Sequence, residues 1–98
     1  MAAQPRTAVI VARRLVVRGR VQGVGFRHAA TRAASEAGVV GWVRNRNDGT
    51  VEAFAQGAPA AVEAYADWCR TGPPIARVIA VDVEDACIDP ELVRFVQR

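Results

Sequence analysis

Hydrophobic positions follow two different periods along this chain, and their order predicts its secondary structure. Apolar and polar residues alternate over about Val9–Arg20, which predicts a strand with Leu15 and Val17 on one face. From Phe26 the apolar positions recur every three to four residues through an alanine-rich stretch, which indicates a helix, and Gly38 is suited to cap its end. A strand followed by a helix therefore begins the fold.

The second half of the chain predicts three further strands and one further helix. Residues 39–45 and 51–55 have the composition and alternation of strands, and the Asp-Gly turn between them predicts a hairpin. A second helix is predicted to open at Gly57-Ala58-Pro59, with proline in its first turn, and to stop at Thr71-Gly72-Pro73-Pro74. Residues 79–84 predict a fourth strand whose odd-numbered residues form its apolar face. Residues 93–96 are candidates for a short last strand.

The order β-α-β-β-α-β predicts an α+β domain of the ferredoxin-like, split βαβ type. With right-handed crossovers and a paired hairpin, the strands form an antiparallel sheet that carries both helices on one face. We expect residues 1–12 to be a partly disordered tail and residues 13–98 to form a single domain, since a chain of 98 residues suffices for one hydrophobic core. This fold hosts unrelated functions, so function must be argued from a site.

The apolar runs and the cysteines indicate the cellular compartment of the protein. The longest uninterrupted apolar run, Ala8–Ala12, is far too short to span a membrane, and Arg13 and Arg14 follow it where a signal-peptide cleavage site needs small residues. Cys69 and Cys87 lack CxxC spacing and form no disulfide framework, so we expect two buried or half-buried thiols. We expect a cytoplasmic monomer that does not bind membranes.

Positive charge is concentrated in one third of the sequence. Residues 13–46 contain eight arginines against the single acidic residue Glu36, whereas the rest of the chain has five arginines and nine acidic residues. Such a segment indicates an anionic partner, with nucleic acid or a small phosphorylated molecule as candidates. A solvated basic face explains the charge equally well.

The basic segment contains a glycine-rich loop that leads directly into the first predicted helix. Glycines let backbone N–H groups converge, and the free N–H groups of a helix start add to them, so the loop is a candidate cradle for a phosphate-sized anion. The candidate binding residues are Gln22, Gly23, Val24, Gly25, Phe26 and Arg27. The spacing matches neither a Walker A loop nor a dinucleotide-binding motif, and a tight structural turn fits the glycines equally well.

The presence of Arg27 favours the interpretation of the glycine loop as an anion site over that of a structural turn. An arginine in the first turn of a helix faces the positive end of the helix dipole, which costs about 0.3 to 1 kcal/mol unless a bound anion compensates it. Its planar guanidinium can donate two hydrogen bonds to one phosphate group. His28 lies next to it without the setting of a nucleophile, and we interpret it as an ordinary helix residue.

Two ordered motifs resemble the acylphosphatase family. The first is Gly-Arg-Val-Gln-Gly-Val-Gly-Phe-Arg at residues 19–27, and the second combines Gly-Trp-Val-Arg-Asn at 41–45 with Asp-Gly-Thr-Val-Glu at 48–52. The resemblance extends from about Leu15 to the C-terminus. It implies a ferredoxin-like fold and the metal-free hydrolysis of acyl phosphates to a carboxylate and inorganic phosphate, with no cofactor.

The resemblance also implies roles for individual residues. Arg27 and the loop amides from Gln22 to Arg27 would bind the phosphoryl group, and Asn45 would orient the attacking water. From the residues alone, an asparagine before a turn also serves to start it, and Asn47 is better explained by the turn itself. An acyl phosphate has a good leaving group, so positioning the water and stabilising charge suffice for catalysis.

The chain has alternatives to this function. A lone histidine, two distant cysteines and no acidic cluster in the basic segment do not assemble a metal site, so we expect none. A non-catalytic phosphate-binding module and an RNA-binding module of the same fold are the alternatives. RNA binding needs aromatic residues clustered on the sheet, and the two middle strands supply only Trp42 and Phe54. Trp42 is therefore interpreted as packing on the sheet, and the presence of both Arg27 and Asn45 favours turnover.

Overall fold

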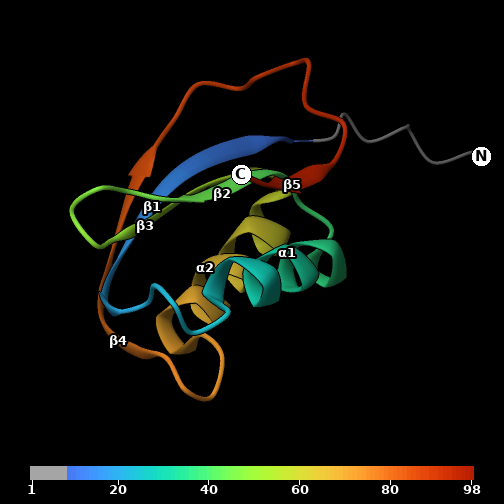
Figure 1. The fold of residues 1–98 in the computed structure, drawn as a ribbon. Coiled ribbons are helices and arrows are strands. Elements are labelled where there is room, and N and C mark those ends of the chain that lie inside the picture. The colour runs from blue at the N-terminus through green and yellow to red at the C-terminus, as the bar shows by residue number, and fades with distance from the viewer. Residues whose placement is uncertain (1–8) are drawn as a thin grey trace, which may run out of the picture.

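The computed structural model describes residues 9–98 (Figure 1). Within this range the chain forms five strands and two helices: β1 (Val11–Arg20), α1 (Phe26–Ala37), β2 (Val40–Asn45), β3 (Val51–Gly57), α2 (Pro59–Thr71), β4 (Arg77–Asp85) and β5 (Phe95–Gln97). Residues 1–8 of the expected tail lie outside the described residues. Of the remainder, Val11 and Ala12 belong to β1.

The five strands form one sheet in the order β4-β1-β3-β2-β5. Both helices cover the same face of this sheet (Figure 1), which confirms the ferredoxin-like α+β fold. Three strand pairs are antiparallel, but β5 pairs parallel with β2, so the sheet is mixed rather than wholly antiparallel. The parallel pair arises because the chain leaves β4 at one edge of the sheet and crosses to the opposite edge.

Glycines flank helix α1 on both sides, and the one after it, Gly38, is the cap that the sequence predicts. Gly25 precedes it at φ 77° and Gly38 follows it at φ 84°, both in the left-handed region that glycine adopts without strain. The N–H of Gly38 donates to the carbonyl oxygen of Ala34 at 2.9 Å, which terminates the helix. The buried face of α1 consists mainly of alanines, and their small side chains allow the helix to lie close to the sheet.

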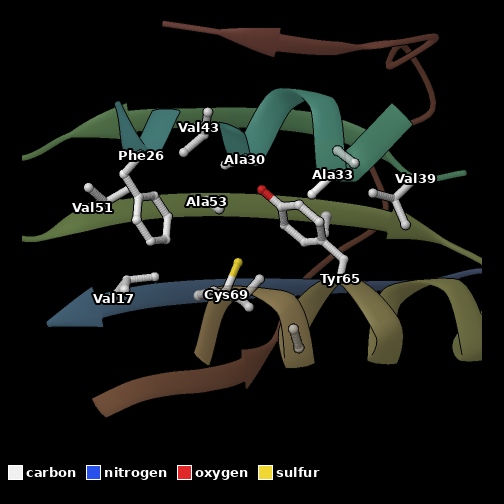
Figure 2. Close-up of a cluster of buried hydrophobic side chains, with 14 of the residues drawn as sticks. Val17, Phe26, Ala30, Ala33, Val39, Val43, Val51, Ala53, Tyr65 and Cys69 are labelled. Atoms are coloured by element: carbon white, nitrogen blue, oxygen red, sulfur yellow. The ribbon is translucent and has the colours of Figure 1, made fainter. Parts of the chain in front are cut away.

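The hydrophobic core lies between the sheet and the two helices (Figure 2). Its largest fully buried side chains are Tyr65, Phe26, Leu15, Val17, Val21, Val43, Val51 and Cys69. Phe26 is the first residue of α1, and its ring packs against Trp68 of α2 with centroids 5.4 Å apart. Phe26 therefore anchors the start of α1, and with it the end of the glycine loop, to the core.

Strand β4 differs from its predicted facing pattern at one position. The register against β1 shifts between Arg18 and Gly19, so that Arg18 pairs with Ala80 and Gly19 pairs with Val78. Ile79 is the extra residue of this bulge and is 82% exposed, while Val78 packs against the core in its place. The expectation that all odd-numbered residues of 79–84 share the apolar face was wrong at Ile79.

The two thiols lie in different environments. Cys69 is fully buried in α2, where burial raises the pKa of its thiol to about 12. Cys87 is exposed in the segment that follows β4. The expectation of a buried or half-buried thiol was therefore right for Cys69 and wrong for Cys87, because the chain leaves the sheet edge before Cys87.

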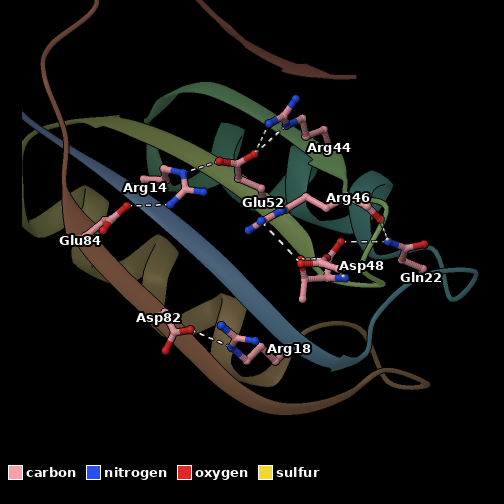
Figure 3. A network of polar contacts seen from close by, with 10 residues as sticks. Arg14, Arg18, Gln22, Arg44, Arg46, Asp48, Glu52, Asp82 and Glu84 are labelled. Carbon is pink, nitrogen blue, oxygen red and sulfur yellow. Dashed lines mark hydrogen bonds and ion pairs between the residues drawn. The ribbon is translucent and has the colours of Figure 1, made fainter.

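Ion pairs cover the face of the sheet that points away from the helices (Figure 3). The carboxylate of Glu52, 3% exposed, accepts hydrogen bonds from Arg14 and from Arg44. Arg18 donates to Asp82 at 2.8 Å. Burial by itself would raise the pKa of Glu52, but the hydrogen bonds from the two guanidinium groups outweigh it and hold this pKa below its usual value. Much of the basic charge of residues 13–46 is thus neutralised within the fold.

Candidate active site

The glycine loop presents a helix start without any capping side chain. Gly23 and Gly25 have φ of 73° and 77°, and no side chain caps α1 at Gly25. The first turn of α1 also contains no acidic residue. The N–H groups of this turn therefore lack a side-chain acceptor, and the positive end of the helix dipole is uncompensated.

A small cavity lies against this loop and brings distant residues together. Its volume is about 120 Å³, and its lining residues are Val21, Gly23, Gly25, Phe26, Arg27, His28, Asn45 and Gln97. Arg27 comes from α1 and Asn45 from the end of β2. Since side chains alternate along a strand, Asn45 lies on the same face of β2 as the buried Val43, the face toward the helices. The fold thus places both predicted catalytic residues around one cavity.

A larger and shallower hollow, about 360 Å³, lies on the hairpin and is lined by residues 44–48. It shares Asn45 with the small cavity but includes neither the glycine loop nor Arg27. Its two arginines are already occupied, because Arg44 pairs with Glu52 and Arg46 lies 3.6 Å from a carboxylate oxygen of Asp48. The small cavity is therefore the one at which the glycine loop, Arg27 and Asn45 converge.

Arg27 is half-buried, and its side chain is held by the residue that follows the edge strand β5. Its Nη1 donates to the main-chain oxygen of Arg98 at 2.7 Å. Arg27 pairs with no Asp or Glu side chain among residues 9–98, in contrast to Arg14, Arg18 and Arg44. Because a guanidinium carries five N–H donors, most of its donors are available to an anion in the cavity.

Gln22 connects the glycine loop to the β2–β3 hairpin (Figure 3). Its side-chain Nε2 donates to the main-chain oxygens of Arg46 and Thr50, at 2.8 and 2.9 Å. The side chain of Gln22 therefore contacts the hairpin rather than the cavity, and Val24 is buried in the core. Of the six predicted loop residues, Gly23, Gly25, Phe26 and Arg27 line the cavity.

Asn45 and Asn47 have different surroundings at the turn between β2 and β3. The carboxylate of Asp48 accepts hydrogen bonds from the N–H and the hydroxyl of Thr50, at 3.0 and 2.6 Å, and these bonds lower the pKa of Asp48. Gly49 has φ 89°, which this turn requires. Asn47 lies within the turn and does not line the small cavity, whereas Asn45 does.

Three lining residues, Val21, His28 and Gln97, were not singled out as site residues from the sequence. Gln97 is brought to the cavity by the parallel pairing of β5 with β2, in which it lies opposite Val43. His28 lines the rim as an exposed residue, although its sequence position indicated only a helix residue. No local signal in the sequence points to Gln97, since its place depends on a long-range strand pairing.

Residues 9–98 contain no group of three or more histidine, cysteine, aspartate or glutamate side chains arranged to hold a metal ion. Neither of the two helices in this range has both the length and the apolar character needed to cross a membrane.

An arginine, a helix start and a carboxamide around one small cavity make up a candidate anion-binding site on an α+β fold. The sequence model of the family described as acylphosphatase matches residues 13–97 of the chain. The acylphosphatase of Methylococcus capsulatus is 49% identical over 81 residues, which cover 83% of this chain and 88% of that protein. The acylphosphatase of Thermococcus kodakarensis is 56% identical over 71% of this chain and 77% of its own length.

Solved structures agree with the sequence relatives. An acylphosphatase from Coxiella burnetii superposes with a TM-score of 0.86 at 32% identity, covering 91% of this chain and 93% of that one. The acylphosphatase from Bacillus subtilis superposes with a TM-score of 0.85 at 33% identity, covering 92% of this chain and 99% of that one. The chain therefore belongs to the acylphosphatase family. It is an enzyme that hydrolyses acyl phosphates, as its sequence motifs predict.

Proposed function

We propose that this enzyme hydrolyses its substrate by in-line attack of a water molecule on a phosphoryl group held in the small cavity. Arg27 and the loop amides from Gln22 to Arg27 bind the phosphoryl oxygens, and Asn45 orients the water. The observation that carries this proposal is the convergence of Arg27, Asn45 and the α1 N-terminus on one cavity of about 120 Å³.

The phosphoryl group is bound mainly by charge and by oriented donors. The uncapped start of α1 supplies free N–H groups, and the positive φ of Gly23 and Gly25 lets the loop backbone turn toward the same point. Arg27 adds a positive charge, and no Asp or Glu side chain among residues 9–98 pairs with it. These groups stabilise the equatorial oxygens of the phosphoryl group, where charge is spread in the transition state.

Asn45 contributes orientation rather than proton transfer. A carboxamide both donates and accepts hydrogen bonds, so it can hold a water molecule in a defined direction, but it is not a general base. Because the attacking and leaving oxygens lie in line across the phosphorus, the acyl group leaves on the side away from Asn45. A carboxylate leaves readily, so no strong general acid is required.

We also propose that the reaction needs no metal ion or cofactor and that the enzyme acts as a cytoplasmic monomer without nucleic-acid or membrane partners. The free thiols of Cys69 and Cys87 are compatible with a reducing compartment. The phosphate site consists of main-chain donors and one guanidinium, which bind phosphate without a metal.

Benzoyl phosphate hydrolysis, measured with and without a chelator, tests the proposal. We expect equal rates in both conditions for the wild type and no measurable turnover for Arg27→Ala. Activity that disappears with the chelator and returns with added Mg²⁺ would overturn the metal-free mechanism. Wild-type activity in Arg27→Ala would overturn the assigned phosphoryl site.

A further inference from the structure

Trp42 has a set of contacts that the proposed mechanism does not use. It lies on β2, on the face of the sheet away from the helices, because its neighbour Val43 faces the core. Its ring stacks on Phe54 of β3 with centroids 6.1 Å apart and an interplanar angle of 14°. Two guanidinium groups lie over the ring, that of Arg98 at 4.8 Å and that of Arg44 at 5.5 Å from the centroid.

Arg98 connects this aromatic pair to the cavity on the other face. Its N–H donates to the main-chain oxygen of Val43 at 2.8 Å, and its guanidinium lies over the ring of Trp42. Its own main-chain oxygen accepts the hydrogen bond from Nη1 of Arg27 at 2.7 Å. The side chain of Arg98 therefore contacts the open face of the sheet, while its main chain contacts the proposed phosphoryl-binding arginine.

This oxygen lies one residue beyond β5, whose first residue, Phe95, is anchored by packing against Tyr65 in the core, whereas its far end has, among residues 9–98, only the pairing with β2 and the Arg98 contacts. Arg98 follows β5, which is three residues long and pairs only with β2, at the edge of the sheet. Short edge strands open locally at low cost, so a side-chain anchor beyond the last paired residue has a direct effect on their order. Arg44 lies over the same ring but is already held by Glu52, so Arg98 is the guanidinium that relies on Trp42.

We propose that Trp42 is a positioning residue for catalysis, which acts through Arg98. By holding the Arg98 guanidinium on the open face, Trp42 keeps the Arg98 main-chain oxygen where it accepts one donor of Arg27. The remaining donors of Arg27 then point into the cavity in a defined orientation. This inference rests on the proposed role of Arg27 in binding the phosphoryl group.

Four variants test the proposal: Trp42→Leu, Trp42→Phe, Arg98→Ala and the double variant Trp42→Leu/Arg98→Ala. We expect Trp42→Leu and Arg98→Ala each to lower kcat/KM for benzoyl phosphate about tenfold, and to raise the inhibition constant of inorganic phosphate by a similar factor. The double variant should be no worse than either single one, because both remove the same anchor. Trp42→Phe keeps an aromatic face and should recover most of the loss.

Controls separate positioning from stability. Arg18→Ala deletes another arginine from the same face of the sheet, where it pairs with Asp82, and should leave kcat/KM unchanged. Because Arg98 is exposed, Arg98→Ala should keep the wild-type melting temperature within a few degrees. A purely structural role for Trp42 would shift the melting temperature of Trp42→Leu without changing phosphate inhibition.

The proposal is overturned if both single variants keep wild-type phosphate inhibition and kcat/KM, or if their losses multiply in the double variant. Arg27→Ala is measured alongside. If Arg27→Ala is inactive while the Trp42 and Arg98 variants match the wild type, only the positioning role is wrong. If Arg27→Ala retains activity, the assigned phosphoryl site itself is wrong.

Discussion

The side-chain amide of Gln22 donates to the main-chain oxygen of Thr50 at 2.9 Å, and through this contact the glycine loop is attached to the hairpin. A second bond from the same nitrogen reaches the main-chain oxygen of Arg46 at 2.8 Å. The loop carries the proposed phosphoryl-binding amides, and the hairpin carries Asn45. One side chain therefore links the two halves of the proposed site and, together with the strand pairing, helps to fix their spacing.

Gln22→Ala should loosen this spacing. We expect kcat/KM for benzoyl phosphate to fall on the order of tenfold or more, because water and phosphoryl group are no longer held in register. Gln56→Ala is a matched control, since the Gln56 side chain also makes two hydrogen bonds, to the main chain of Asp89, but outside the cavity. It should lose a similar stability, about 1 kcal/mol, and keep wild-type kcat/KM. Equal activity losses in both variants would contradict the role of Gln22.

Arg27→Lys should be nearly as inactive as Arg27→Ala, with the fold intact in both. Lysine provides a point charge in place of a planar guanidinium, so it cannot donate two parallel hydrogen bonds to one phosphoryl group while also reaching the Arg98 oxygen. Steady-state kinetics and circular dichroism check this. If Arg27→Lys kept most of the wild-type kcat/KM, the two-pronged contact would be wrong.

Substitutions of Asn45 and Asn47 should have very different effects on activity. Asn45→Ala should lower kcat by about 10² to 10³ while phosphate affinity stays near wild type, because only the water loses its orientation. Asn45→Asp should be at least as damaging, since a carboxylate repels the phosphoryl oxygens. Asn47→Ala should cost less than about 1 kcal/mol of stability and keep its activity. An inactive Asn47→Ala beside an active Asn45→Ala would move the water-orienting role to the turn.

Inorganic phosphate should stabilise the native enzyme because it occupies the cavity only when the protein is folded. Its addition at tens of millimolar, roughly the range of weak anion sites, should raise the melting temperature of the wild type and inhibit hydrolysis competitively. Arg27→Ala should show neither effect. Sodium chloride at matched ionic strength separates specific binding from general salt effects. If phosphate raised the melting temperature of Arg27→Ala as much as that of the wild type, the cavity would not be the binding site.

Glu52 should make stability depend on pH in acid. Its pKa in the folded state lies below the usual value of 4.5, so its contribution is complete above that value and is lost as the pH falls through the lower, folded pKa. Glu52→Gln should therefore reduce the free energy of unfolding at pH 7 by about 1 to 2 kcal/mol, since Arg14 and Arg44 are part-exposed and regain water. Urea denaturation across pH 2.5 to 7 measures this (roughly the range over which a carboxylate titrates). If the wild type and Glu52→Gln still differed in free energy of unfolding at the lowest pH, the contribution assigned to ionised Glu52 would be wrong.

The amino-acid sequence by itself determined the local structure of this protein. Periods of two and of three to four residues specified the main strands and both helices, because each element buries one face and local spacing decides which residues share that face. The glycines at 23, 25 and 38 marked the bounds of α1, since their left-handed backbone is a local property. The resemblance of two motifs indicated the family, and the loop before Arg27 indicated an anion site.

Only the tertiary structure decided which of these segments meet. Ile79 is exposed because a register shift between two distant strands inserts it as a bulge, and no local pattern encodes that shift. Gln97 reaches the cavity, and Arg98 reaches both Arg27 and Trp42, only because the chain crosses the whole width of the sheet after β4 and then pairs β5 with β2. Such pairings depend on the summed packing of the complete sheet rather than on the residues that they bring together.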